Sequence, residues 1–367
     1  MRNDAARIAV YPGDGIGHEV IPATIEVLKQ LEKHIGGFSL FFEEHAGGAA
    51  YYSETGKDMS DKAFNAGGDA DAILLGAMGL PTIRHPDGTE IAPHLRMREV
   101  YNLVSGVRPV KAYPNTPCRL ADPRAAKIDF IILRESTEGL FYSRDKGEVQ
   151  DDKVAYETLR ISRHVTEQLC DTAFDLARQR KAKGGKGQVT CVDKSNVFRA
   201  YAFFRKIFYE RARENPDIKA NDAYVDAMAL DLIRKPWESD VLVMENMFAD
   251  ILSDLGGGLV GGMGMAPCAE IGTNHALFQP AHGSAPDIAG QDKANPLAAI
   301  LSGGMMLAWL GQRMHNPKMS EAAVLLEAAV EQAFSNNALR PMEFGGDQGT
   351  RDATRAVCQS LEQITRS

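Results

Sequence analysis

The sequence predicts an α/β fold, because segments typical of strands and of helices alternate from its beginning. Residues 8–11 and 38–43 are strand-like apolar runs, and residues 19–34 between them have the spacing of an amphipathic helix. The apolar run at residues 72–75 ends at a glycine, as a buried parallel strand does. This order of strand, helix and strand is typical of a sheet covered by helices.

The same alternation continues through the middle of the chain. A basic stretch at residues 84–108 is followed by four prolines, which we interpret as the first domain boundary: Pro109, Pro114, Pro117 and Pro123. A long helix is expected at residues 157–178, and further strands are expected at residues 130–134, 188–192 and 240–244. The glycine-rich residues 256–264 are expected to carry the chain back towards the first domain.

Composition narrows the class of protein. The 367 residues suffice for two domains or one large one, and the 44% hydrophobic and 25% charged residues are typical of a soluble globular enzyme. A net charge of −8 argues against nucleic acid or an anionic membrane as the main partner. No apolar run approaches the ~20 residues of a membrane span, and no apolar signal region precedes the first strand, so we expect a cytoplasmic protein. The five cysteines are scattered, which indicates neither a disulfide framework nor a zinc site.

A pair of carboxylates follows the apolar strand at residues 240–244. Asp250 and Asp254 are four residues apart, so on a helix their side chains share one face. Two carboxylates so placed repel each other, whereas a hard divalent cation would bind both. Asp226 is a third candidate, because it lies among apolar residues, where an unpaired charge is costly. These aspartates indicate a Mg²⁺ or Mn²⁺ site; the alternative is a solvated acidic surface.

Basic residues at strand ends indicate an anionic substrate. Arg108 and Arg134 end predicted strands, where α/β proteins place their ligand crevice, and Arg98 precedes them. Guanidinium groups bind carboxylates through two hydrogen bonds, so three arginines beside a metal site predict a di- or tricarboxylate substrate. Lys194 follows a third strand and could act as a general base if nearby positive charge lowers its pKa. For each of these residues alone, a solvated surface position is the commoner outcome.

Two loops have unusual compositions. Gly13-Asp14-Gly15-Ile16-Gly17 lies between a strand and a helix, but its spacing is GxGxG rather than the GxGxxG of a Rossmann dinucleotide site. We therefore interpret it as a tight turn. The second loop runs over residues 282–290, where glycine and proline constrain the path and His282 and Asp287 offer polar contacts. The spacing alone does not distinguish this segment from a plain loop.

In combination these motifs resemble the β-decarboxylating 2-hydroxyacid dehydrogenases, which include isopropylmalate, isocitrate, homoisocitrate and tartrate/D-malate dehydrogenases. The resemblance runs from Pro12 to Pro296 and so covers nearly the whole chain. It implies an isopropylmalate-dehydrogenase-like two-domain α/β fold that is not a Rossmann fold, with the active site in the cleft between domains. The cofactor-binding domain would comprise residues 1–107 and 264–367, and residues 108–263 would form the substrate, metal and dimerisation domain.

The resemblance also implies a role for each motif. Arg98, Arg108 and Arg134 would hold the malate carboxylates, and Asn196 would lie near the nicotinamide. The metal ligands would be Asp250 and Asp254 of one subunit and Asp226 of the partner subunit. Lys194 of the partner subunit would deprotonate the 2-hydroxyl. Adenosine-binding positions would be Ile16, His282, Gly283, Ser284, Ala285, Asp287, Ile288 and Asn295. Because metal and base cross the interface, we expect at least a homodimer with shared active sites.

The implied reaction is oxidative decarboxylation of an (R)-malate-type 2-hydroxy acid to a 2-keto acid and CO₂, with NAD and Mg²⁺ or Mn²⁺. The metal would polarise the ketone and stabilise the enolate as CO₂ leaves. NAD is expected rather than NADP, because Asp287 would accept hydrogen bonds from ribose hydroxyls and repel a 2′-phosphate. The substrates that remain open are D-malate, tartrate, isocitrate and 3-isopropylmalate.

Two segments depart from the family pattern. The catalytic acid of the family is a tyrosine, and Phe141 stands at that position. Tyr142 follows it, but on a strand it would face the opposite way, so only a loop or bulge would present its hydroxyl to the substrate. Phe141 also permits the alternative of a catalytically weak, metabolite-binding regulatory homologue.

The second departure is in the segment that selects the substrate. His94 stands where isopropylmalate enzymes carry leucine and isocitrate enzymes carry asparagine. An imidazole facing an alkyl group loses a hydrogen-bonding partner, so His94 favours a polar or absent C3 substituent. If His94 turns outward, Leu95 and Val197 would line the pocket instead.

Overall fold

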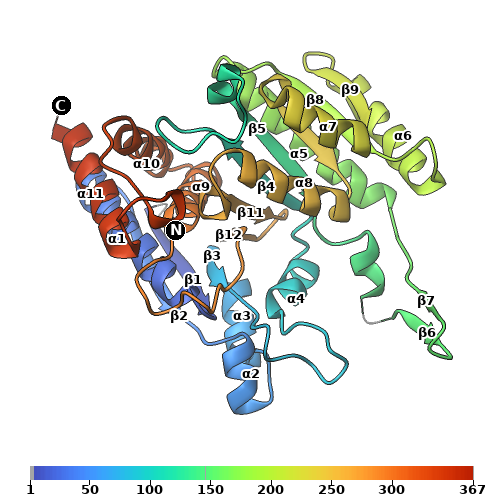
Figure 1. Cartoon of the computed structure of the whole chain (residues 1–367), viewed down its shortest axis with the longest axis horizontal. Helices are drawn as coiled ribbons and strands as arrows, with labels where there is room; N and C mark the ends of the chain where they lie inside the picture. The colour runs from blue at the N-terminus through green and yellow to red at the C-terminus, as the bar shows by residue number, and fades with distance from the viewer. Residues whose placement is uncertain (1–3, 145, 367) are drawn as a thin grey trace.

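The computed structural model describes residues 4–144 and 146–366 and confirms the α/β class (Figure 1). Met1 to Asn3, which precede the first strand, lie outside the described residues. The order of elements is β1 (Ala5–Gly13), α1 (Gly17–Ile35), β2 (Ser39–Glu44), α2 (Ala49–Thr55), α3 (Asp61–Asp69), β3 (Ala72–Ala77), α4 (Pro93–Val100), β4 (Ser105–Lys111), β5 (Asp129–Glu135), β6 (Glu148–Gln150), β7 (Val154–Tyr156), α5 (Arg163–Ala182), β8 (Gln188–Asp193), α6 (Arg199–Glu214), β9 (Lys219–Tyr224), α7 (Val225–Arg234), β10 (Val241–Met244), α8 (Asn246–Leu259), β11 (Pro267–Ile271), β12 (Ala276–Pro280), α9 (Leu297–Arg313), α10 (Pro317–Ser335) and α11 (Thr350–Arg366).

One ten-stranded sheet runs through the molecule in the order β2-β1-β3-β12-β11-β4-β5-β10-β8-β9. Both outer parts of the sheet are parallel, and antiparallel pairing occurs only where β11 and β4 join them. The first boundary predicted between domains, at residues 107 and 108, lies inside β4, and the second lies inside a 3₁₀ turn at Met263–Met265. No helix among residues 4–144 and 146–366 is long and apolar enough to cross a bilayer.

Helices cover both faces of the sheet, which explains the nearly continuous apolar character of its strands. In β1, Ile8 and Val10 join a core cluster with α1 and α9, whereas Ala9 and Tyr11 pack with residues of α3 and α4. The side chains of β10 alternate in the same way: they pack against α5 on one face of the sheet and against α7 and α8 on the other. The centre of the sheet is therefore buried, and the predicted site residues Arg108 and Arg134 lie on its neighbouring strands β4 and β5.

The helix predicted at residues 157–178 begins later than expected. Residues up to Tyr156 form β7, and the backbone N–H and C=O groups of Arg160 both bond to Gly139, at 3.1 and 3.0 Å. That pairing holds the chain extended, so α5 starts at Arg163. The prediction was wrong here because a long-range backbone contact overrides the helical periodicity.

The glycine-rich segment at residues 256–264 was only partly predicted. Its first residues complete the last turn of α8 rather than forming a connection. A Cβ atom at Gly256 would lie 2.7 Å from Cγ2 of Val110, so the helix approaches β4 too closely for a side chain. The return towards β11 begins at Gly261 and Gly262, whose φ angles are 137° and 154°.

Candidate active site

Three arginine side chains gather near the middle of the sheet. Arg134 lies on β5, Arg108 on the adjacent strand β4, and Arg98 in the last turn of α4. Their side chains are nearly buried, with exposed fractions of 3%, 8% and 6%. Burial, followed by repulsion from Arg108 and Arg98, lowers the pKa of Arg134 to about 10. An anionic ligand placed among the three guanidinium groups would relieve that repulsion.

Neutral groups on α8 orient two of these arginines. Asn246 Oδ1 accepts hydrogen bonds from Arg134 Nε at 3.1 Å and Nη2 at 2.7 Å. Ser253 Oγ accepts a hydrogen bond from Arg108 Nη1 at 2.6 Å. Neither residue was predicted from the sequence, because an asparagine and a serine on a helix carry no distinctive spacing.

The predicted aspartate pair lies beside the arginines. Asp250 accepts a hydrogen bond from Arg134, and its Oδ1 atom is 3.5 Å from Arg108 Nη1; Asp254 Oδ1 is 3.9 Å from the same nitrogen. Their side chains remain 52% and 62% exposed, so their oxygens are accessible. Partial burial raises the pKa of Asp254, and repulsion from Asp250 adds to this against the opposing effect of Arg108. Two mutually repelling, accessible carboxylates suit a hard divalent cation.

Within the described part of one chain, Asp226 does not form a metal-binding group with Asp250 and Asp254. Its carboxylate pairs with Lys194 Nζ at 2.5 Å, and this hydrogen bond lowers the pKa of Asp226. The side chain is 68% exposed, so the expectation of apolar surroundings was wrong: Asp226 lies in the first turn of α7, where the apolar neighbours point inward. Among the residues that the structure describes, no three His, Cys, Asp or Glu side chains are placed to hold a metal.

His94 is partly buried, and the charges of the arginine cluster act on it. Burial, followed by the positive charge of Arg98, lowers its pKa to about 3, and Arg144 and Arg134 act in the same direction. Within the described part of the chain, its Nδ1 atom is buried without a hydrogen-bond partner, as are the Nε atoms of Arg98 and Arg108. These unpaired polar atoms indicate that a polar ligand completes the site.

The two unusual loops pack against each other. Ile16 N donates to Ser284 O at 2.8 Å, and a Cβ atom at Gly15 would lie 2.0 Å from that oxygen. Gly15 has a φ of 55°, which confirms the tight turn. In the facing loop, His282 Nε2 is buried without a partner among the described residues, and Gly283 has open space around it. Within the described residues, this loop therefore has a buried polar atom without a partner beside an open position at Gly283.

Other predicted positions in this region differ in their surroundings. Asn295 is engaged by the protein itself, since its Nδ2 donates to Glu343 Oε2 at 2.8 Å and its Oδ1 accepts from Leu297 N at 3.2 Å. Asp287 and Asn196 are exposed, Ile288 is partly buried, and Ala285 has a positive φ of 37°. Glu343 was not predicted, because it lies outside every motif in the sequence.

Comparison with known proteins identifies the family. A family model described as isocitrate/isopropylmalate dehydrogenase matches residues 7–360. The chain belongs to this family. The 3-isopropylmalate/3-methylmalate dehydrogenase of Methanocaldococcus jannaschii is 40% identical over 358 residues, which make up 97% of this chain and 99% of that protein.

Solved structures of the isocitrate/isopropylmalate dehydrogenase family have the same fold. The isocitrate dehydrogenase of Methylococcus capsulatus has a TM-score of 0.84 at 30% identity and covers 98% of this chain and 100% of its own. The β-decarboxylating dehydrogenase of Thermococcus kodakarensis, solved in its apo form, has a TM-score of 0.78 at 34% identity, with coverages of 98% and 97%. The protein is therefore a β-decarboxylating dehydrogenase, and the expected isopropylmalate-dehydrogenase-like fold is confirmed.

The departure at the family's tyrosine has a clear geometry. Phe141 and Tyr142 lie in a 3₁₀ turn, Leu140–Ser143, rather than on a strand. The Phe141 ring centre is 5.6 Å from Arg134 Cζ, whereas the Tyr142 ring stacks 3.9 Å from Arg160 Cζ and lies 4.5 Å from Lys146 Nζ. Of these two rings, the one beside Arg134 is Phe141, which carries no hydroxyl.

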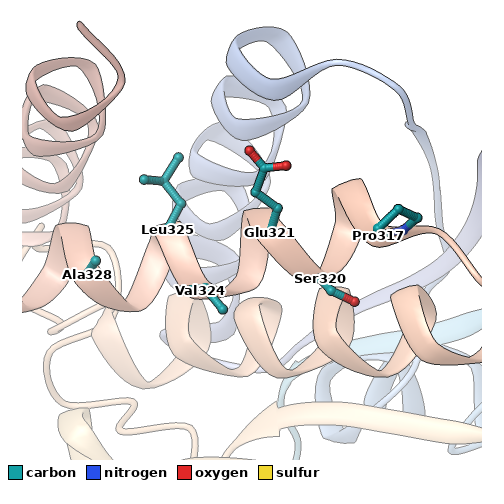
Figure 2. A pocket seen from close by; sticks show the side chains of 6 residues that line it. All are labelled: Pro317, Ser320, Glu321, Val324, Leu325 and Ala328. Atoms are coloured by element: carbon teal, nitrogen blue, oxygen red, sulfur yellow. The ribbon is translucent and has the colours of Figure 1, made fainter. Parts of the chain in front are cut away.

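A surface hollow on α10 has no connection with these residues (Figure 2). It is lined by Pro317, Ser320, Glu321, Val324, Leu325 and Ala328. No residue of the predicted site lines it, and its walls are mostly apolar.

Proposed function

We propose that this chain catalyses the NAD- and divalent-metal-dependent oxidative decarboxylation of an (R)-malate-type 2-hydroxy acid with a polar or absent C3 substituent. The observation that carries the proposal is the Asp250 and Asp254 pair on α8, directly beside Arg108 and Arg134. Such a pair brings a cation and a substrate carboxylate to one place.

The side chains at the site fit two bound groups, a divalent metal ion and NAD. Asp250 and Asp254 of one chain, with Asp226 of the partner subunit, would hold Mg²⁺ or Mn²⁺, and the loop from His282 to Ile288 with Ile16 would hold NAD. When bound, the metal would supply a Lewis acid and NAD a hydride acceptor. The buried, unpaired Nε2 atom of His282 and the accessible carboxylates of the two α8 aspartates support these assignments.

The protein's own side chains orient the substrate and move its protons. Arg98, Arg108 and Arg134 bind the substrate carboxylates in a buried setting, where such hydrogen bonds are strong. Lys194 of the partner subunit removes the proton of the 2-hydroxyl, and Asn196 would lie near the nicotinamide. Tyr142 is the proposed donor of the proton at C3. Loss of keto-acid formation in a Tyr142→Phe variant would support that role, and unchanged turnover would exclude it.

The substrate proposal rests on His94. Its unpaired Nδ1 atom needs a hydrogen-bonding partner, which an isopropyl group does not offer. D-malate, tartrate and isocitrate avoid that loss, so we place them ahead of 3-isopropylmalate, although the relative from M. jannaschii is named for 3-isopropylmalate and 3-methylmalate.

A homodimer is part of the proposal. Large apolar side chains are exposed on α7 and α8 and just after β8, where a second copy would need to pack: Val197, Phe198, Leu230, Ile233, Met247 and Ile251. The hairpin of β6 and β7 projects from the body of the molecule (Figure 1) and exposes Val149, Val154 and Tyr156. Exposed apolar patches of this kind are typical of association surfaces.

The five unpaired cysteines suit a reducing compartment such as the cytoplasm.

The decisive experiment measures NADH formation with Mn²⁺ against a panel of (R)-malate derivatives. Turnover that a chelator abolishes and added Mn²⁺ restores is the expected result. An absence of turnover with every derivative, while the metal and the cofactor still bind, would favour the metabolite-binding regulatory homologue, which Phe141 beside Arg134 permits.

A further inference from the structure

Glu270 places a buried negative charge within the arginine cluster. It lies on β11 with no exposed side-chain surface, and its Oε1 atom is 2.9 Å from Arg98 Nη2. Burial would raise the pKa of this carboxyl, but Arg98, Arg108 and Arg134 together hold the pKa below its ordinary value. Glu270 is therefore charged at neutral pH, although it lies among apolar strand residues in the sequence.

The sheet is built to accommodate this carboxylate. Glu270 is opposite Gly106 of β4, and Gly106 is opposite Arg134 of β5. A Cβ atom at Gly106 would lie 2.9 Å from Glu270 Oε2 and 2.6 Å from Ser136 Oγ. Only a residue without a side chain leaves room there for the carboxylate to reach the arginines. The register between β11 and β4, together with the glycine at position 106, therefore fixes where the Glu270 carboxylate lies.

The remaining charges near the cluster are compensated by other groups. In the proposed function Asp250 and Asp254 neutralise a divalent cation, Asp226 of the partner subunit is paired with Lys194 of that same subunit, and Arg144 has its own partner in Glu99 at 3.5 Å. His94 is neutral, as its lowered pKa requires. Three arginines and one glutamate are left, so the site carries a net charge of two positive units towards the substrate.

We propose that Glu270 is a positioning residue that makes the site select dicarboxylates over tricarboxylates. This inference rests on the proposed function and narrows its substrate class. Two substrate carboxylates match the net charge of the site. A third substrate carboxylate would approach the Glu270 carboxylate, and Arg98 could not offset the repulsion because it is already paired with Glu270. Such a like-charge contact in a buried site is unfavourable. Within the class that His94 favours, malate and tartrate are therefore accepted, and isocitrate and its homologues are disfavoured.

The test compares Glu270→Gln, which keeps the shape and removes the charge, with Glu270→Asp, which keeps the charge. In Glu270→Gln the ratio of kcat/KM for isocitrate to kcat/KM for D-malate should rise by about tenfold or more, mainly through KM. Glu270→Asp should keep the wild-type ratio. Asp240→Asn is the matched control, because Asp240 is also buried and pairs with an arginine, Arg180 Nε at 2.6 Å, outside the site.

An equal loss for both substrates in Glu270→Gln would show that the carboxylate only maintains the structure, and would overturn the inference. So would a wild-type preference for isocitrate, which needs no variant to fold. If no hydroxy acid is oxidised, the proposed function fails, and the preference for dicarboxylates is then tested by binding alone. Thermal-shift titrations of wild type and Glu270→Gln with succinate and with propane-1,2,3-tricarboxylate measure that binding. Tighter binding of the tricarboxylate by the wild-type protein would also refute the inference.

Discussion

At the scale of single residues, burial decides the chemistry of His94. The imidazole is neutral at physiological pH, because burial and Arg98 lower its pKa to about 3. It therefore acts as a hydrogen-bonding group rather than as a cation. The sequence left open whether His94 points inward or outward; the structure buries its Nδ1 atom, which indicates the inward orientation. Val197, expected to line the pocket in the outward case, is 59% exposed.

A substitution tests the contribution of His94 to substrate choice. His94→Leu should shift the ratio of kcat/KM towards 3-isopropylmalate relative to D-malate by roughly tenfold, because it removes an unpaired buried nitrogen worth about 1–3 kcal/mol. Steady-state kinetics with both substrates measures the shift. His34→Leu, at an exposed histidine on α1, is the control and should change neither value. An unaltered ratio in His94→Leu would show that His94 does not select the substrate.

Glu135 makes stability depend on pH. Burial raises its pKa from 4.5 to about 7, despite hydrogen bonds from Thr137 and Glu138. A raised pKa in the folded state means that the contribution of Glu135 to stability is full below pH 4.5 and is lost as pH rises towards about 7. Relative to Glu135→Gln, the wild-type protein should lose up to about 3 kcal/mol of unfolding free energy across that range. Urea unfolding at several pH values measures this; parallel profiles for the two proteins would contradict it.

At the scale of elements, two loops form the proposed cofactor site. The turn after β1 was predicted from its glycines, and Asp14 fixes it by accepting hydrogen bonds from the N–H groups of Ala49, Ala50 and Gly79, each at 2.8 Å. The loop after β12 packs on that turn through Ser284. The role of Asp14 was not predicted, because its three partners are distant in the sequence.

The exposed carboxylate of Asp287 in this second loop should make the enzyme prefer NAD. A 2′-phosphate would be repelled there, so kcat/KM should favour NAD over NADP by about 10²-fold or more. Asp287→Ala should reduce that preference, whereas Asp347→Ala, which removes another exposed carboxylate, should leave it intact. Equal kcat/KM for the two cofactors in the wild-type enzyme would refute the assignment.

At the scale of the whole molecule, the exposed apolar side chains of α7 are expected to be covered by a second copy. Leu230→Asp should convert the dimer to a monomer, because it places a charge in an apolar interface. Analytical ultracentrifugation measures the change. Val324→Asp, on α10, is a matched control, since Val324 is 62% exposed and Leu230 54%. A wild-type monomer, or a stable Leu230→Asp dimer, would be inconsistent with this interface.

Shared active sites predict complementation between two inactive chains. Lys194→Ala and Asp250→Asn should each abolish Mn²⁺-dependent turnover as pure dimers while leaving the fold intact. In a mixed dimer one site receives both intact residues, so randomly mixed chains should regain about a quarter of the wild-type activity. Co-expression with two affinity tags isolates the mixed species. No recovery in the purified mixed dimer would mean that the lysine and the aspartates act within one chain.

The sequence by itself determined the fold class and the principal motifs, because hydrophobic period and residue spacing are local properties. The four-residue spacing of Asp250 and Asp254 on one helix and the tight turn at Gly15 are both local features, and the structure has both where the sequence predicted them. The family also followed from the sequence, since its motifs are specific in combination.

Only the tertiary structure decided which groups meet and in what charge state. Register between β11, β4 and β5 brings Glu270 to Arg134 across Gly106, and no spacing in the sequence encodes that alignment. The start of α5 was likewise set by a contact between distant segments, the backbone pairing of Gly139 with Arg160. Burial then shifts the pKa values of His94 and Glu135, because the cost of a charge depends on everything packed around it.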